Sequence, residues 1–131
     1  MANLGKVLLV DDDEATNYIS ANMLRLMHAA ERIAVAKNGR DALELVAREP
    51  FDLVLLDTDM AVMDGFEFLE AMKLLQEATG IIPPAIVMLT ASEQGLDKAS
   101  AAQYPVKGCL TKPLTQGQVN RLVHLVAEGA A

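Results

Sequence analysis

The sequence predicts an α/β fold built around a parallel sheet. Strand-like and helix-like stretches alternate along the 131 residues with short connections between them, which is typical of repeated βαβ units. Three of the strand-like runs end abruptly at charged residues, namely Val7–Val10 before Asp11, Leu53–Leu56 before Asp57 and Gly108–Thr111 before Lys112. Short apolar runs of this kind indicate strands that are buried on both faces of a parallel sheet. We expect strands at about residues 6–10, 32–36, 52–57, 85–90 and 107–111.

The segments between the expected strands carry apolar residues at helical spacing, so that each helix has one stripe to bury. In chain order, we expect these stripes at Ala15, Ile19, Met23, Leu26 and Met27; at Ala42, Leu45 and Val46; at Phe68, Leu69, Met72 and Leu75; and at Val119, Leu122, Val123 and Val126. A further helix at about 94–102 should pack least firmly, because Gly95 lowers its propensity and Leu96 is its one large apolar side chain.

Capping residues indicate where three of the helices begin. Asn38, Asp64 and Thr115 each stand three positions before an acid or an amide, at Asp41, Glu67 and Gln118 respectively. This spacing allows the capping side chain and the later side chain to satisfy backbone groups of the first turn.

Composition limits the partners of the chain. A hydrophobic content of 52% is ample for a packed core. The net charge of -7 argues against direct binding of nucleic acid, because phosphate backbones attract clustered Lys and Arg. The longest early apolar run, residues 7–10, is too short for a signal-peptide core or a membrane span. We therefore expect a cytoplasmic protein that does not bind membranes. We also expect a monomer or a weak dimer.

Several charged residues should meet at one edge of the sheet. The carboxyl ends of parallel strands lie together, and open α/β sheets bind their ligands there. Asp11, Asp12 and Asp57 should therefore lie close to one another, with Lys112 at the same edge. Crowded carboxylates repel one another unless a cation lies among them. A set of oxygen ligands of this kind suits a hard divalent cation, Mg2+ or Mn2+.

A series of motifs follows the strands in a fixed order. The motifs are Asp11-Asp12 after the first strand, Asp57 after the third with Met60, Asp64 and Gly65 beyond it, Thr90-Ala91 after the fourth and Lys112-Pro113 after the fifth. Together they resemble the receiver domain of two-component response regulators, over about residues 5–128. The resemblance implies a flavodoxin-like (βα)5 fold, a doubly wound parallel five-stranded sheet in the order 2-1-3-4-5. We expect residues 1–131 to form a single receiver domain.

The resemblance also implies a role for the residues that would handle phosphate. Asp57 would be the phosphoacceptor, which receives a phosphoryl group from a histidine kinase or a phosphotransfer protein. Lys112 would pair with Asp57 at rest and with a phosphoryl oxygen afterwards. Thr90 would donate its hydroxyl to another phosphoryl oxygen, and its inward movement would be the switch. Such a domain is not an enzyme in the usual sense, although it would catalyse its own phosphorylation and dephosphorylation at Asp57.

The metal ligands are implied in the same way. Asp12 would bind Mg2+ directly, Asp11 would hold a metal-bound water, and the backbone carbonyl of Asp59 would complete the set together with Asp57. Mg2+ keeps several waters, so a few protein oxygens suffice.

Three positions depart from the family pattern. Cys109 stands where an aromatic residue is usual, so switching by an aromatic ring is not expected. Ala61 replaces the usual proline beside the phosphoacceptor. Asp59, two residues after Asp57, would either hinder or position the water that hydrolyses the aspartyl phosphate.

Two alternatives differ in chemistry. Asp57-Thr58-Asp59 resembles the Asp-x-Asp motif of the haloacid dehalogenase superfamily, which would make the protein a phosphohydrolase. That motif normally follows the first strand, whereas here it follows the third. The other alternative is a pseudo-receiver that only binds partners. Pseudo-receivers typically lose an acid or the lysine, and this chain retains Asp11, Asp12, Asp57 and Lys112.

Overall fold

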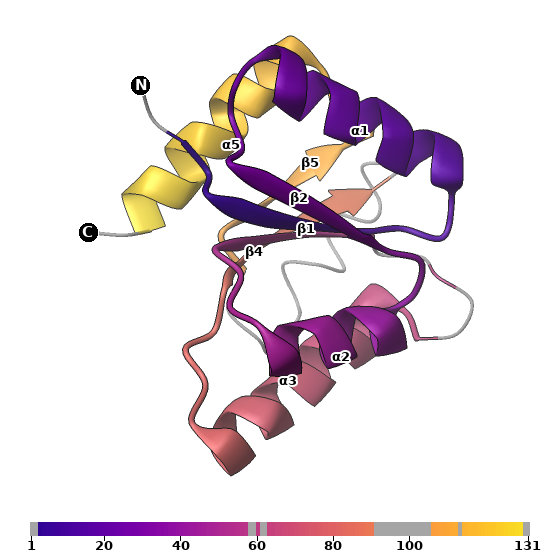
Figure 1. The fold of residues 1–131 in the computed structure, drawn as a ribbon, viewed down its shortest axis with the longest axis vertical. Helices are drawn as coiled ribbons and strands as arrows, with labels where there is room; N and C mark the ends of the chain where they lie inside the picture. Colours follow the sequence, from indigo (N-terminus) through magenta and orange to yellow (C-terminus); the bar gives the residue numbers. More distant parts are fainter. Residues whose placement is uncertain (1–2, 58–59, 61–62, 91–105, 113, 130–131) are drawn as a thin grey trace.

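A five-stranded parallel sheet forms the centre of the protein (Figure 1). The computed structural model describes residues 3–57, 60, 63–90, 106–112 and 114–129. The strands are β1 (Lys6–Val10), β2 (Arg32–Ala36), β3 (Leu53–Asp57), β4 (Ala85–Thr90) and β5 (Gly108–Thr111), and the helices are α1 (Glu14–Leu26), α2 (Gly39–Arg48), α3 (Gly65–Thr79) and α5 (Gln116–Gly129). The strand order β2-β1-β3-β4-β5 confirms the predicted flavodoxin-like fold. Within the described residues, no helix is both long enough and apolar enough to span a membrane.

The register of the sheet brings the strand ends together. Val10 of β1 is paired with Ala36 on one side and with Leu56 on the other. The residues that follow, Asp11 and Asp57, are therefore neighbours at the carboxyl edge. On the other side of β3, Thr90 at the end of β4 is paired with Thr111 at the end of β5.

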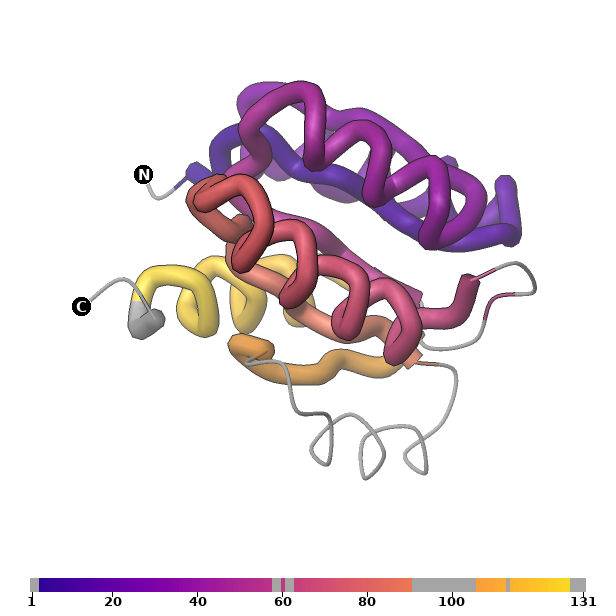
Figure 2. The backbone as a smooth tube through the Cα atoms, turned by 90° about the horizontal axis from the view of Figure 1, so that it is seen from below, coloured from indigo at the N-terminus to yellow at the C-terminus, as the bar shows by residue number. Residues whose placement is uncertain are grey.

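Helices cover both faces of the sheet. Figure 1 shows α1 and α5 on one face and α2 and α3 on the other, and in Figure 2 α2 and α3 run side by side across the sheet. Because successive side chains of a strand point to opposite faces, the strands supply two separate cores. Leu8, Val54 and Ile86 belong to the core beneath α2 and α3, whereas Leu9 and Leu55 belong to the core beneath α1 and α5.

The predicted capping residues begin their helices. The side chain of Asn38 accepts a hydrogen bond from the backbone N–H of Asp41 at 2.8 Å. Asp64 accepts one from the N–H of Glu67 at 2.9 Å, and Glu67 accepts one in return from the N–H of Asp64. These contacts satisfy N–H groups that have no partner within the helix.

The prediction of which residues of α1 are buried is wrong. Its buried residues are Asn17, Ser20, Ala21 and Leu24, whereas Ala15, Ile19 and Leu26 are exposed and Met23 and Met27 are partly exposed. Both sets have helical spacing, and hydropathy favours the set with more large apolar side chains. The helix buries the other set, and Asn17 can belong to it because its amide donates a hydrogen bond inside the protein. The other three stripes are buried or partly buried, while the weak helix expected at 94–102 lies outside the described residues.

Candidate functional site

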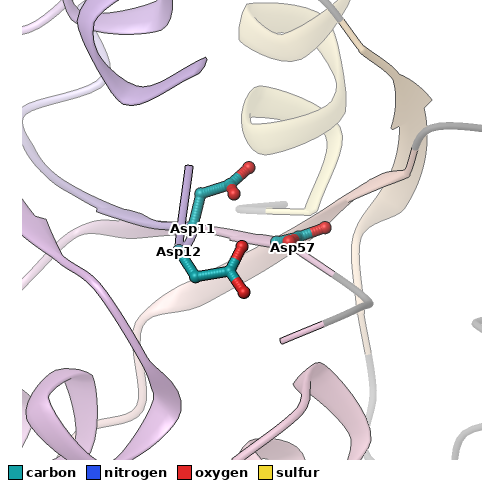
Figure 3. Close-up of side chains that lie close together, drawn as sticks. All are labelled: Asp11, Asp12 and Asp57. Atoms are coloured by element: carbon teal, nitrogen blue, oxygen red, sulfur yellow. The ribbon is translucent and has the colours of Figure 1, made fainter. Parts of the chain in front are cut away.

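Three carboxylates gather where β1 and β3 end. Asp11, Asp12 and Asp57 each offer a carboxylate oxygen, and these oxygens all lie within 4.8 Å of one another. Figure 3 shows the three side chains close together beyond the ends of the two strands. The structure thus brings together the acids that the sequence predicted would meet.

The three acids lie in two different environments, because successive side chains of a strand point to opposite faces of the sheet. Asp11 and Asp57 continue the rows of Leu9 and Leu55, which face α1 and α5. Both acids are buried, with 4% of each residue exposed. Asp12 has the opposite parity and is exposed to solvent. The site therefore has two enclosed carboxylates and one open carboxylate.

Lys112 lies between the two enclosed acids. Its Nζ atom is 2.5 Å from Oδ2 of Asp11 and 2.9 Å from Oδ1 of Asp57. Burial by itself would lower the pKa of Lys112, but the contacts with Asp11 and Asp57 outweigh that effect and raise the pKa above its ordinary value. The ammonium group therefore remains charged and offsets much of the repulsion between the two carboxylates.

Thr90 lies at the end of β4 and is buried. Its backbone carbonyl accepts a hydrogen bond from the N–H of Lys112 at 2.8 Å. This contact extends the pairing of β4 with β5 past Thr111 and connects the backbone of Thr90 directly to Lys112. The predicted contribution of Asp59 lies outside the described residues.

Cys109 is half-buried in β5, opposite Met88 of β4. Burial raises the pKa of its thiol. The position that usually carries an aromatic ring therefore holds a small, un-ionised side chain in this protein.

The donor set fits a hard divalent cation. All three groups are carboxylates, which suit Mg2+ or Mn2+ rather than a soft metal. In addition, Oδ2 of Asp11 is buried and, among the residues that the structure describes, has no well-aligned hydrogen-bond donor, although Lys112 lies beside it. An oxygen in this condition can accept a further electrostatic partner. Asp11, Asp12 and Asp57 can therefore hold a metal ion.

Comparison with known proteins agrees with the fold and the acids. The family model of the response regulator receiver domain matches residues 7–124. The chain belongs to this family. This receiver carries an acidic triad, Asp11, Asp12 and Asp57, that is typical of a phosphoacceptor site. Together with the position of Asp57 on β3, the family match favours the receiver over the haloacid dehalogenase alternative.

Two of the curated relatives are much longer than this receiver. The sensor histidine kinase GacS of Pseudomonas protegens is 34% identical over 118 residues, which cover 90% of this receiver and 13% of the kinase. A protein-glutamate methylesterase/protein-glutamine glutaminase of a Nocardioides species is 35% identical over 129 residues, which cover 94% of this receiver and 33% of that protein. The receiver thus spans only a small part of these two relatives.

Solved structures include matches of similar size. The chemotaxis protein CheY4 of Vibrio cholerae has a TM-score of 0.74 with this receiver at 27% identity, covering 93% of this chain and 98% of CheY4. The bacteriophytochrome response regulator AtBRR has a TM-score of 0.79 at 25% identity, covering 93% of this chain and 91% of AtBRR.

Two amides that support the site of this receiver were not predicted as site residues. Asn17 donates to the backbone carbonyl of Asp11 at 2.8 Å, and Gln118 donates to the backbone carbonyl of Thr111 at 2.6 Å. Gln118 was predicted only as a partner in helix capping, and Asn17 is a polar residue on the side of α1 that hydropathy assigned to solvent. An amide six or seven residues from a strand end is a weak signal in one sequence.

Proposed function

We propose that this receiver accepts a phosphoryl group on Asp57 from a phosphohistidine donor, and that the modification switches its contacts with other proteins. The observation that carries the proposal is the placement of Lys112, which lies 2.9 Å from Oδ1 of Asp57 and beside Asp11. A phosphoacceptor needs an ionised carboxylate and a cation that can also neutralise the transferred group. Asp57 and Lys112 supply these two parts.

The proposed reaction is a displacement at phosphorus. A carboxylate oxygen of Asp57 attacks the phosphorus of phosphohistidine, the O–P bond forms, the N–P bond breaks, and the histidine ring leaves with the electron pair of that bond. Lys112 then pairs with a phosphoryl oxygen. The hydroxyl of Thr90 donates to another phosphoryl oxygen, and its inward movement carries the signal to the strand end that it shares with Lys112.

Asp11 and Asp12 would hold Mg2+ or Mn2+ together with Asp57, and the proposal keeps the backbone carbonyl of Asp59 as a further ligand. When bound, the metal ion neutralises charge on the phosphoryl group as it is transferred. Asp12 is suited to direct binding because it is exposed, whereas Asp11 is enclosed and already beside Lys112. This difference supports Asp12 as the direct ligand and Asp11 as the residue that holds a metal-bound water.

A histidine kinase or a phosphotransfer protein is the proposed donor. Support comes from the receiver segment matched in the sensor histidine kinase GacS. We also propose that residues 1–131 act as one receiver domain in the cytoplasm, as a monomer or a weak dimer. The downstream target would be another protein and neither nucleic acid nor a membrane, in keeping with the net charge of -7.

The test is incubation with a small phosphodonor and Mg2+, followed by intact mass. The wild-type protein should gain the mass of one phosphoryl group, and Asp57→Asn should gain none. Asp52→Asn is the matched control, because Asp52 precedes the other end of the same strand. It should be phosphorylated like the wild type. Equal phosphate incorporation in Asp57→Asn would refute the assignment of Asp57.

The same measurement tests the pseudo-receiver alternative. A pseudo-receiver would bind partners through the same fold without taking up phosphate. No mass gain in the wild-type protein, with small donors and with a phosphorylated histidine protein, would favour that alternative. The presence of all three acids and the lysine in one cluster favours phosphorylation.

A further inference from the structure

A buried amide contacts the backbone of the acidic turn. Asn17 lies on the inner side of α1 with 5% of the residue exposed. Its Nδ2 atom donates a hydrogen bond to the backbone carbonyl of Asp11 at 2.8 Å. A buried amide without a partner would be costly, and this contact explains why a polar side chain occupies the inner face of α1.

The carbonyl in question belongs to the peptide unit that joins Asp11 to Asp12. The orientation of this unit is described by the ψ angle of Asp11 and the φ angle of Asp12. It thereby determines the direction in which the Asp12 side chain leaves the backbone. A hydrogen bond from Asn17 to this carbonyl therefore acts on Asp12 without touching its carboxylate.

The residues on either side of Asp12 are held by further hydrogen bonds. The N–H of Asp11 donates to the carbonyl of Ala36 at 3.2 Å, and Oδ1 of Asp11 accepts from the N–H of Asp13 at 2.9 Å. Asp13 in turn caps α1 by accepting from the N–H of Ala15 at 3.0 Å. The contact from Asn17 links the body of α1 to the peptide before Asp12.

We infer that Asn17 is a positioning residue for the metal-binding turn, which holds the Asp11–Asp12 peptide so that the Asp12 carboxylate faces Asp57 and Asp11. The inference rests on the proposed function insofar as Asp12 binds a metal ion. Partners that orient metal ligands typically affect metal affinity although they do not touch the metal. Asn17 differs from such partners in acting on the backbone next to the ligand and not on the ligand side chain.

The test compares Asn17→Leu and Asn17→Ala with two controls on the same helix face. Ser20→Ala removes another buried polar side chain about one turn away, and Leu24→Ala removes buried apolar contacts. Mg2+ binding is measured by calorimetry, and thermal unfolding reports stability. The two Asn17 variants should bind Mg2+ about tenfold more weakly than the wild type. The controls should bind it normally, even where Leu24→Ala is the less stable protein.

A second measurement needs no metal. The Asp13 amide, which is bonded to Oδ1 of Asp11 in the wild type, should exchange its hydrogen faster in metal-free Asn17→Leu and at the wild-type rate in Ser20→Ala. Unchanged Mg2+ affinity together with unchanged Asp13 exchange in folded Asn17 variants would overturn the inference. A loss of Mg2+ affinity in Leu24→Ala equal to that in the Asn17 variants would also overturn it. Failure of the wild type to bind Mg2+ would instead refute the proposed metal site, and the exchange result would still decide whether Asn17 holds the turn.

Discussion

The Nζ atom of Lys112 lies 2.9 Å from Oδ1 of Asp57, although β4 separates β5 from the strand that carries Asp57. The same atom reaches Asp11, whose strand lies beyond β3. One flexible side chain thus spans the carboxyl edge of the sheet across β4. The two acids that it reaches belong to neighbouring strands, so that removal of this cation leaves them facing each other.

Replacement of Lys112 by methionine should therefore destabilise the metal-free protein at neutral pH. We expect a loss of about 2 kcal/mol, less than removal of one partner of a fully buried ion pair costs, because the lysine is partly exposed. Urea unfolding measures the change. Lys73→Met, at an exposed position of α3, should have a much smaller effect. Addition of Mg2+ should recover more stability in Lys112→Met than in the wild type, and equal recovery would contradict the account of carboxylate repulsion.

The raised pKa of Lys112 predicts a pH dependence with a definite sign. The ion pairs with Asp11 and Asp57 favour the charged ammonium in the folded protein, in spite of burial. The stabilisation is complete below the pKa of an ordinary lysine, about 10.4, and is lost as the pH rises through the higher folded value. The difference in unfolding free energy between the wild type and Lys112→Met should therefore be constant from pH 7 to 9 and shrink at strongly alkaline pH. A difference that grows above pH 10 would show the opposite sign.

The site could be anticipated from sequence because its acids follow apolar strands. A strand such as β3 is buried on both faces, so its apolar run ends where the chain leaves the core, and the next charged residue must lie at the edge. The strand order then places the carboxyl ends of β1 and β3 side by side. The argument needs only the residue types and the parallel arrangement.

The supporting amides could not be anticipated in the same way. For α1, hydropathy selects Ile19 and Leu26, while the folded protein buries Asn17. The buried amide of Asn17 is satisfied by a hydrogen bond to a backbone carbonyl, and no side-chain pattern reports where a carbonyl will point. Burial of a polar residue is favourable only with that partner, which exists only after the turn has formed.

Asp12 and Asp13 are adjacent acids with separable roles. Asp12 is exposed and belongs to the acidic triad, whereas Asp13 caps α1 through the N–H of Ala15 and the hydroxyl of Thr16. Asp12→Ala should weaken Mg2+ binding with little loss of stability. Asp13→Ala should lower stability while Mg2+ still binds. Parallel metal titrations and urea unfolding of both variants measure the two effects, and a variant that loses both properties equally would contradict the division.

The cap also has a pH dependence. The hydrogen bond from Thr16 and that from the N–H of Ala15 lower the pKa of Asp13. The stabilisation by the cap is therefore present above the pKa of an ordinary aspartate, about 3.9, and is lost as the pH falls through the lower folded value. The stability gap between the wild type and Asp13→Ala should close in strongly acidic solution. A gap that persists at the lowest pH at which both proteins fold would indicate a neutral packing effect.

Gln118 donates a hydrogen bond to the peptide before Lys112, just as Asn17 donates one to the peptide before Asp12. Its Nε2 atom donates to the carbonyl of Thr111 at 2.6 Å, and that carbonyl belongs to the peptide unit that joins Thr111 to Lys112. A second contact runs from Nε2 to Oγ1 of Thr111 at 3.2 Å. The first turn of α5 therefore holds the backbone from which the cation extends. We predict that Gln118→Leu costs about 1 kcal/mol for the lost hydrogen bonds and also weakens the contacts of Lys112.

A double-mutant cycle separates these two effects of Gln118→Leu. If Gln118 acts through Lys112, the loss caused by Gln118→Leu should be smaller in a Lys112→Met background, with a coupling of at least about 0.5 kcal/mol. Gln116 lies two residues away in the same helical turn and is exposed, so Gln116→Leu is the matched control. Its effect should add to that of Lys112→Met within about 0.3–0.5 kcal/mol, as for independent sites. Additive effects of Gln118→Leu and Lys112→Met would mean that Gln118 only stabilises the start of α5, and that the position of Lys112 is determined by Asp11 and Asp57 alone.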